Sequence, residues 1–102
     1  MTIKSKTRKF LEKLTGGTLT IAKILKSTRE AEELSQVEFA KMLGIPKQNL
    51  CDIEKGRRFI SPNLAAKFAN KLGYSQKQYI RIALQDLLIR HGLNYEVHIT
   101  AA

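Results

Sequence analysis

Apolar residues recur every three or four positions along most of this chain, a spacing that places them on one face of an α-helix. The clearest such stretch covers residues 20–33, where Ile21, Ile24, Leu25 and Thr28 form a single stripe. We therefore expect a helix of about this length, with its stripe turned towards a core.

Helix start and stop signals divide the rest of the chain into further helices. Ser35 and Glu38 have the spacing of a capping box, in which each side chain accepts from the backbone N–H of the other residue. Gly44 can adopt the left-handed conformation that ends a helix, and Pro46 suits the first turn of the next one. The expected helices cover residues 35–43, 46–55, 62–72 and 75–91, which gives an all-α core of about five helices.

The two ends of the chain differ from this core. Residues 1–15 carry apolar side chains at helical spacing among basic residues, which predicts a short N-terminal helical extension. Residues 93–99 alternate between apolar and polar side chains, which predicts a short C-terminal β-strand. A lone strand cannot satisfy its own backbone, so this strand needs a partner. We expect a basic N-terminal extension at 1–17, one domain at 18–92 and a strand or tail at 93–102.

Composition bounds the class of protein. The chain has 102 residues, 43% of them hydrophobic and 26% charged, which suits one soluble globular domain. No apolar stretch is long enough to span a bilayer, and no apolar run follows the basic N-terminus as a secretory signal requires. Cys51 is the single cysteine, which excludes an internal disulfide and a multi-thiolate metal site. We expect a cytoplasmic protein that makes no contact with a membrane.

Charge points to a polyanionic partner. Lysine and arginine number 18 against 9 acidic residues, which gives a net charge of +9. Basic residues crowd the N-terminus and recur at Lys47, Lys55, Arg57 and Arg58, whereas acidic residues gather between positions 30 and 38. This polarity is what a nucleic-acid-binding face requires, although basic charge can also serve solubility alone.

The two helices on either side of Gly44 have the most demanding spacing. Ala40 is small where a second helix would cross closely, and Val37, Leu50 and Ile53 can lock the two helices together. So short a turn makes the helices meet at a steep angle and leaves the second one exposed. An ordinary helical hairpin is the alternative. The exposed face would carry Lys47, Gln48, Asn49, Cys51 and Asp52. The first three of these residues can donate hydrogen bonds to base edges or phosphates.

The segment LSQVEFAKMLGIPKQNLCDIEKGRR, residues 34–58, resembles the phage-repressor-like (Cro/Xre) helix-turn-helix family. The resemblance extends weakly over residues 19–88. It implies a five-helix phage-repressor-like domain, of bacterial or phage origin, that binds double-stranded DNA. Pro46 departs from the usual Ser or Thr, so the recognition helix lacks a side-chain cap. The matching elements are Leu34-Ser35-Gln36, Ala40, Gly44-Ile45 and Ile53-Glu54-Lys55-Gly56.

The resemblance also implies roles for individual residues. Arg29 and Glu54 would form an ion pair that ties the first helix to the recognition helix. Asp52 can read a base, or instead pair with a cation or repel a wrong base, and Cys51 can be a packing residue. The implied base-reading residues are Lys47, Gln48, Asp52 and Cys51. The implied phosphate-binding residues are Gln36, Asn49, Lys55, Arg57 and Arg58.

Catalysis and metal binding find no support in the sequence. No nucleophile–base pair, glycine-rich phosphate loop or acidic dyad stands out, so we expect no enzymatic activity. His91 and His98 have no cysteine partner nearby. We therefore expect neither a metal nor another cofactor.

The helix at 75–91 is too apolar for one buried face. Either it is buried on several sides or it forms a dimer interface. A homodimer fits DNA recognition, because two recognition helices related by a two-fold axis span half-sites about 34 Å apart. The expected interface residues are Ile82, Leu84, Leu88, Ile89, Tyr95 and Val97.

We therefore predict a sequence-specific DNA-binding transcriptional regulator, a repressor that binds its operator as a dimer. One alternative is an antitoxin. The resemblance allows it because small relatives with extensions at both ends bind a small toxin and repress their own operon. The net charge of +9 argues against it, because it would repel a basic toxin. The other alternative is a protein-binding adaptor without DNA contact.

Overall fold

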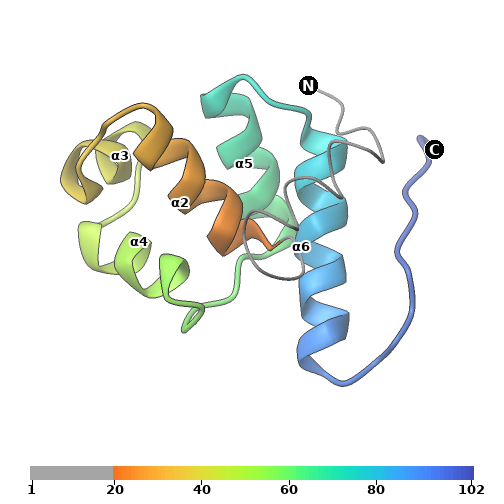
Figure 1. The fold of residues 1–102 in the computed structure, drawn as a ribbon. Coiled ribbons are helices and arrows are strands. Elements are labelled where there is room, and N and C mark those ends of the chain that lie inside the picture. The colour runs from red at the N-terminus through yellow and green to blue at the C-terminus, as the bar shows by residue number, and fades with distance from the viewer. Residues whose placement is uncertain (1–19) are drawn as a thin grey trace.

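The computed structural model describes residues 20–102, and the expected N-terminal extension lies outside the described residues. Within them, an all-helical core is confirmed. Figure 1 shows α5 and α6 side by side, with α2 packed against α6 and α4, and α3 and α4 at the far end of the molecule. The five helices are α2 (Ile21–Ala31), α3 (Gln36–Leu43), α4 (Lys47–Glu54), α5 (Pro62–Leu72) and α6 (Gln76–Arg90).

Side-chain caps explain where most of these helices begin. Thr20, Ser35, Ser61 and Ser75 each accept a hydrogen bond from the backbone N–H three residues further on, over 3.1–3.3 Å. The capping box of α3 is complete, because the Glu38 carboxylate accepts from the Ser35 N–H at 3.0 Å. Hydrogen bonds from the backbone N–H and the side chain of Ser35 to the Glu38 carboxylate hold the pKa of Glu38 below its usual value.

One hydrophobic core joins all five helices. Val37, which was expected to lock α3 to α4, lies outside it and is 49% exposed, so that expectation was wrong. The reason is that α3 buries the face shared by Phe39 and Leu43, four residues apart, and Val37 falls on another side. The largest fully buried side chains are Ile21, Leu25, Phe39, Leu50, Ile53, Phe68, Tyr79 and Ile82.

The C-terminal tail is the main departure from expectation. Residues 93–102 contain no strand, so the predicted β-strand was wrong. The tail runs back alongside α6 (Figure 1), held by Gln85. The Gln85 Nε2 donates to the Tyr95 carbonyl and its Oε1 accepts from the Val97 N–H, both at 2.8 Å. One side-chain amide thus satisfies the two backbone groups that a neighbouring strand would otherwise have bonded.

Candidate nucleic-acid interface

The turn between α3 and α4 is fixed from two sides. Gly44 ends α3 with φ 74°, in the left-handed region where a side chain is strained. The Lys71 ammonium, from α5, donates to the Leu43 carbonyl at 3.1 Å. A Cβ at Gly44 would lie only 2.5 Å from the Lys71 Nζ. The turn therefore needs glycine for its backbone conformation, and a Cβ there would also displace the end of Lys71 from the Leu43 carbonyl.

Ala40, which was expected where α3 and α4 cross closely, is buried. It is 2% exposed, and its carbonyl accepts from the Ile45 N–H in the turn at 3.0 Å. From the other helix, Leu50 and Ile53 enter the core. The inner face of α4 is thus fixed by packing, and its outer face is left to solvent.

α4 carries the four residues that were expected to read bases and also Asn49, which was expected to bind phosphate. Lys47 and Gln48 are exposed, whereas Asn49, Cys51 and Asp52 are half-buried. The expected loss of a side-chain cap is observed, since Pro46 makes no capping bond to the start of α4. A helix N-terminus with its first N–H groups uncapped by a side chain suits contact with a phosphate.

Two of these residues contact each other. The Gln48 Nε2 donates to the Asp52 Oδ1 at 3.1 Å, one turn apart on α4. Two of the four predicted base-reading side chains therefore belong to one hydrogen-bonded unit.

The Arg29–Glu54 ion pair expected from the family resemblance is present. The Arg29 Nε lies 2.9 Å from Glu54 Oε2 and its Nη2 lies 3.0 Å from Glu54 Oε1, a two-point contact. The Arg29 Nη1 also donates to the Leu34 carbonyl at 3.1 Å. The hydrogen bonds to Glu54 raise the pKa of Arg29, which stays charged. This one guanidinium thus joins α2, the turn before α3 and the last residue of α4.

Gln36, which was expected to contact a phosphate, opens α3 and is half-buried. Its Nε2 donates to Glu54 Oε1 at 3.3 Å in the free protein. The amide therefore belongs to the same network as Arg29, and a phosphate contact would share it with Glu54.

The loop after α4 gathers the predicted phosphate-binding cations. Lys55, Arg57 and Arg58 are all exposed. The loop is anchored by the Arg57 N–H, which donates to the Asp52 carbonyl at 2.8 Å. It is also anchored by Phe59, whose ring lies 4.5 Å from the Arg90 guanidinium of α6. The cations are thus carried by a loop that is tied to both α4 and α6.

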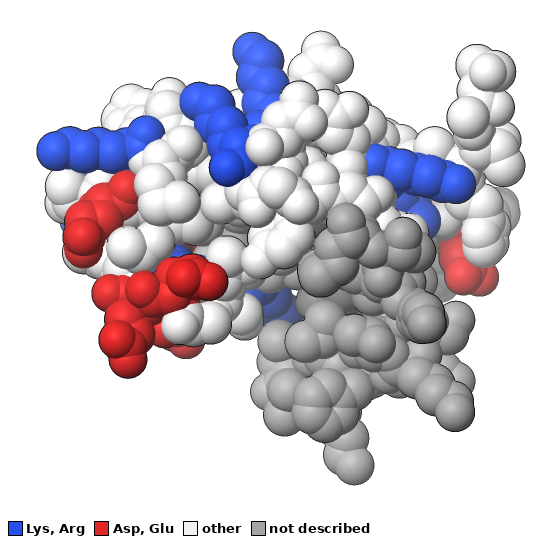
Figure 2. Space-filling view, turned by 90° about the horizontal axis from the view of Figure 1, so that it is seen from above, with Lys and Arg blue, Asp and Glu red and all other residues white. Residues whose placement is uncertain are grey.

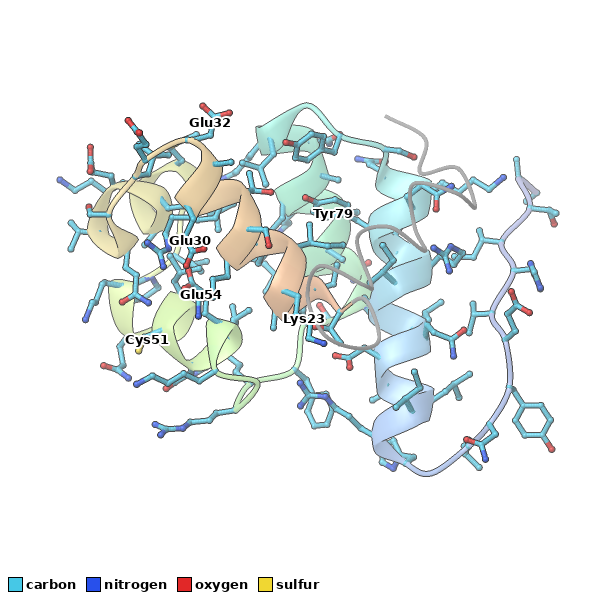
Figure 3. All side chains as sticks on the ribbon, viewed as in Figure 1. Lys23, Glu30, Glu32, Cys51, Glu54 and Tyr79 are labelled. Carbon is cyan, nitrogen blue, oxygen red and sulfur yellow. The ribbon has the colours of Figure 1, made fainter. Side chains whose placement is uncertain are left out.

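Four exposed acidic residues lie on α2, on α3 and in the turn between these helices. Figure 2 shows acidic side chains grouped at the left, on the side of the molecule occupied by α2 and α3, and a separate acidic group at the right. In Figure 3, Glu32 lies at the upper edge and Cys51 of α4 at the lower left. This cluster belongs to α2, α3 and the turn between them, whereas the cationic loop follows α4. The exposed acidic residues of the cluster are Glu30, Glu32, Glu33 and Glu38.

The residues expected at a dimer interface have different exposures. Ile82 is 2% exposed and belongs to the core, so it is not available to a partner in this structure. Leu84, Leu88 and Val97 are half-buried. The last turns of α6 and the start of the tail expose a group of large apolar side chains: Leu87, Ile89, Leu93 and Tyr95.

Two contacts escaped the sequence reasoning. Lys71 caps α3 from a helix 28 residues further on, and no local pattern indicates so distant a pairing. The role of Gln85 could have been predicted, because this residue lies at helical spacing from Ile82 and Ile89 on an apolar helix. A polar residue in such a stripe indicates a specific hydrogen bond, since burial without one is costly.

Other kinds of site are not evident in the part of the chain that the structure describes. Among residues 20–102, no three His, Cys, Asp or Glu side chains are grouped to hold a metal ion. No helix of that range is long and apolar enough to cross a membrane.

A tight glycine turn that joins two helices, with the second helix exposed beside a cationic loop, defines a helix-turn-helix DNA-binding domain. Comparison with known families agrees. The Cro/Xre-like helix-turn-helix family matches residues 25–77, just over half of the chain. The chain belongs to this family, whose members are DNA-binding regulators.

The chain is also similar to a curated protein, the antitoxin PezA of Streptococcus pneumoniae serotype 4 (strain ATCC BAA-334 / TIGR4). The two are 31% identical over 77 residues, which cover 76% of this chain and 47% of PezA. The chain thus spans about half the length of this relative. No solved structure matches the chain.

Proposed function

We propose that this protein is a transcriptional repressor that binds a specific double-stranded DNA operator as a dimer. The observation that carries the proposal is α4, where Lys47 and Gln48 are exposed in the first turn and the cationic loop follows the last turn. Side chains of this kind can read base edges in the major groove, while the cations bind phosphate. The proposal includes a cytoplasmic location. It also includes the expected boundaries of the DNA-binding domain, between residues 17 and 18 and between residues 92 and 93.

The dimer is proposed from the exposed apolar end of α6. Leu87 and Ile89 on the helix and Leu93 and Tyr95 on the tail give a partner copy an apolar surface. A symmetric pair would bring two copies of α4 to successive major grooves. Ile82 is excluded from this interface because it lies in the core.

Selection of bound sequences from a random DNA pool tests the proposal most directly. We expect an enriched sequence with two-fold symmetric half-sites about one helical turn apart. Affinity should fall steeply with salt, because each phosphate contact releases counterions. A protein that binds no DNA at low salt would be an adaptor, and enrichment of an asymmetric single site would contradict the dimer.

Substitutions separate base reading from phosphate binding. Gln48→Ala should lose about 1–3 kcal/mol on the selected operator and much less on random DNA. Arg57→Ala and Arg58→Ala should weaken binding to both by similar factors, because phosphates are the same at every sequence. Equal losses of Gln48→Ala on operator and random DNA would rule out its role in base reading.

An antitoxin role is the second candidate, favoured by the similarity to PezA over three quarters of this chain. It requires a toxin partner, which the apolar end of α6 and the tail can accommodate. The test is a neighbouring gene whose product arrests growth when expressed alone. Relief of that arrest by this protein, and by its Gln48→Ala variant, would establish an antitoxin role separate from DNA reading. Persistent arrest in the presence of this protein would exclude that gene product as its toxin.

A further inference from the structure

The pair formed by Gln48 and Asp52 lies on α4 apart from the side chains that enter the hydrophobic core. Gln48 is exposed, Asp52 is half-buried, and the side chains that hold α4 in the core, Leu50 and Ile53, are on the inner face. The contact of 3.1 Å joins Gln48 Nε2 to Asp52 Oδ1. A hydrogen bond between side chains one turn apart at the surface of a helix adds little to its stability, so the main consequence of this contact would be for recognition.

The chemistry of the two groups fixes which way the amide points. A carboxylate has only acceptor oxygens, whereas the glutamine amide has an NH₂ group at one end and an acceptor oxygen at the other. Turning the Oε1 of Gln48 towards Asp52 would place two acceptors against each other. The NH₂ group must therefore face Asp52, and Oε1 is directed away from it.

The oriented amide has a defined remaining capacity. One of the two N–H bonds of Gln48 is used by Asp52, so one donor and one acceptor are left for DNA. In the major groove, adenine presents an acceptor at N7 and a donor at N6, which such an amide matches at two points. Guanine presents acceptors at both N7 and O6, so it needs two donors and meets only one.

We propose that Asp52 is a positioning residue that orients Gln48 to select adenine over guanine, and this inference rests on the DNA-binding function proposed above. Asp52 then acts on the base through Gln48. A direct contact of Asp52 with a cytosine amino group is the competing role, and it would specify a different base pair.

The test compares the sequences that the full chain and its variants select from a random double-stranded DNA pool. Gln48→Ala first identifies the position whose base preference depends on Gln48. Asp52→Asn keeps the shape of the side chain but can both donate and accept, so it no longer fixes the amide. At that position we expect the adenine-to-guanine ratio to fall about fivefold or more, since a two-point base contact discriminates by about 5- to 150-fold. Asp52→Ala should give the same loss.

Glu32→Gln is the matched control. It removes one negative charge from an exposed residue of the acidic cluster, away from α4 (Figure 3). It should leave the selected sequence unchanged. An equal loss of the adenine preference in this control would assign the effect to charge and overturn the inference.

Random duplex DNA provides a second readout. Asp52→Asn should bind it at least as tightly as the unchanged protein, because a negative charge beside the phosphates is lost. Reduced specificity with undiminished general affinity is a result that damage to the fold would not produce.

The inference is wrong if Asp52→Asn keeps the adenine-to-guanine ratio within twofold. It is also wrong if Asp52→Asn alters a position other than the one that Gln48→Ala alters, because Asp52 would then read its own base. An unchanged protein that enriches no sequence overturns the proposed function itself. Even in that case, ¹⁵N relaxation of the Gln48 side-chain NH₂ in the free protein tests the contact, which should order this group and lose that effect in Asp52→Ala.

Discussion

Replacing Arg29 by methionine would leave the Glu54 carboxylate with little to balance its charge. The Glu54 side chain is 4% exposed, so water cannot take the place of the guanidinium. The contact from Gln36 Nε2, at 3.3 Å, would be the remaining side-chain donor to this carboxylate among the described residues. The substitution therefore tests whether the ion pair stabilises the position of α4 or contributes no more than an exposed ion pair does.

The magnitude follows from the burial of the two partners. Exposed ion pairs contribute about 0–1 kcal/mol, whereas breaking a buried pair costs about 3–5 kcal/mol. Glu54 is nearly buried but the Arg29 side chain retains 16% exposure, so an intermediate value is appropriate. We expect Arg29→Met to lower the free energy of unfolding by about 2–4 kcal/mol. For a domain of this size, the Tm should fall by about 4–8 °C for each kcal/mol lost.

The assay is urea unfolding, followed by circular dichroism, of Arg29→Met, Glu54→Leu and the double variant. The double variant should lose less than the two single variants together by about 2 kcal/mol, because it leaves no unpaired charge. Asp86→Asn is the control, since the Asp86–Arg90 pair lies within one helix at 3.3 Å and should contribute less than about 1 kcal/mol. Losses that add to within about 0.5 kcal/mol would refute the reasoning, because independent residues behave in that way.

Three other substitutions test separate features of the fold. The buried Tyr79 hydroxyl has no hydrogen-bond partner among residues 20–102, so Tyr79→Phe should leave the free energy of unfolding unchanged or raise it by about 1–2 kcal/mol. Burial also raises the pKa of Tyr79, so stability should fall above pH 10 as the unfolded chain ionises first, and this fall should be smaller in Tyr79→Phe. Gly44→Ala should lower the free energy of unfolding by about 1 kcal/mol more than Gly73→Ala, because Gly73 has the same backbone conformation but open space around it. Equal losses would show that the Lys71 contact at Gly44 does not contribute. Gln85→Leu should speed amide exchange at Val97, and unchanged protection there would show that the tail is held otherwise.

Local signals in the sequence were enough to predict most of the helical core. The capping box at Ser35 and Glu38 places the start of α3, and Gly44 places its end, because both act through backbone groups a few residues away. The fold that these helices form was inferred from the family resemblance, which also supplied the Arg29–Glu54 pair. That pair joins residues 25 positions apart, and helical periodicity alone contains no such information.

The tail shows why a correct pattern can lead to a wrong element. Alternation of apolar and polar side chains at residues 93–99 indicates an extended backbone with one face turned inwards. It does not indicate which groups form hydrogen bonds with the N–H and C=O groups of that backbone. The partner is the side chain of Gln85 rather than a strand. Val37 illustrates the same limit for a helix, because being apolar in α3 does not decide which side faces the core.

The structure separates the residues that hold α4 from those that would read DNA. Eight residues are too few for a helix to be stable alone in water, so α4 must draw its stability from tertiary contacts. Those contacts are made by Leu50 and Ile53 in the core and by Glu54 on Arg29. Lys47 and Gln48 take no part in them. Substitutions of Lys47 and Gln48 that alter which operator is bound would therefore cost little stability. A substitution of Glu54 would instead disturb the helix that presents these two side chains.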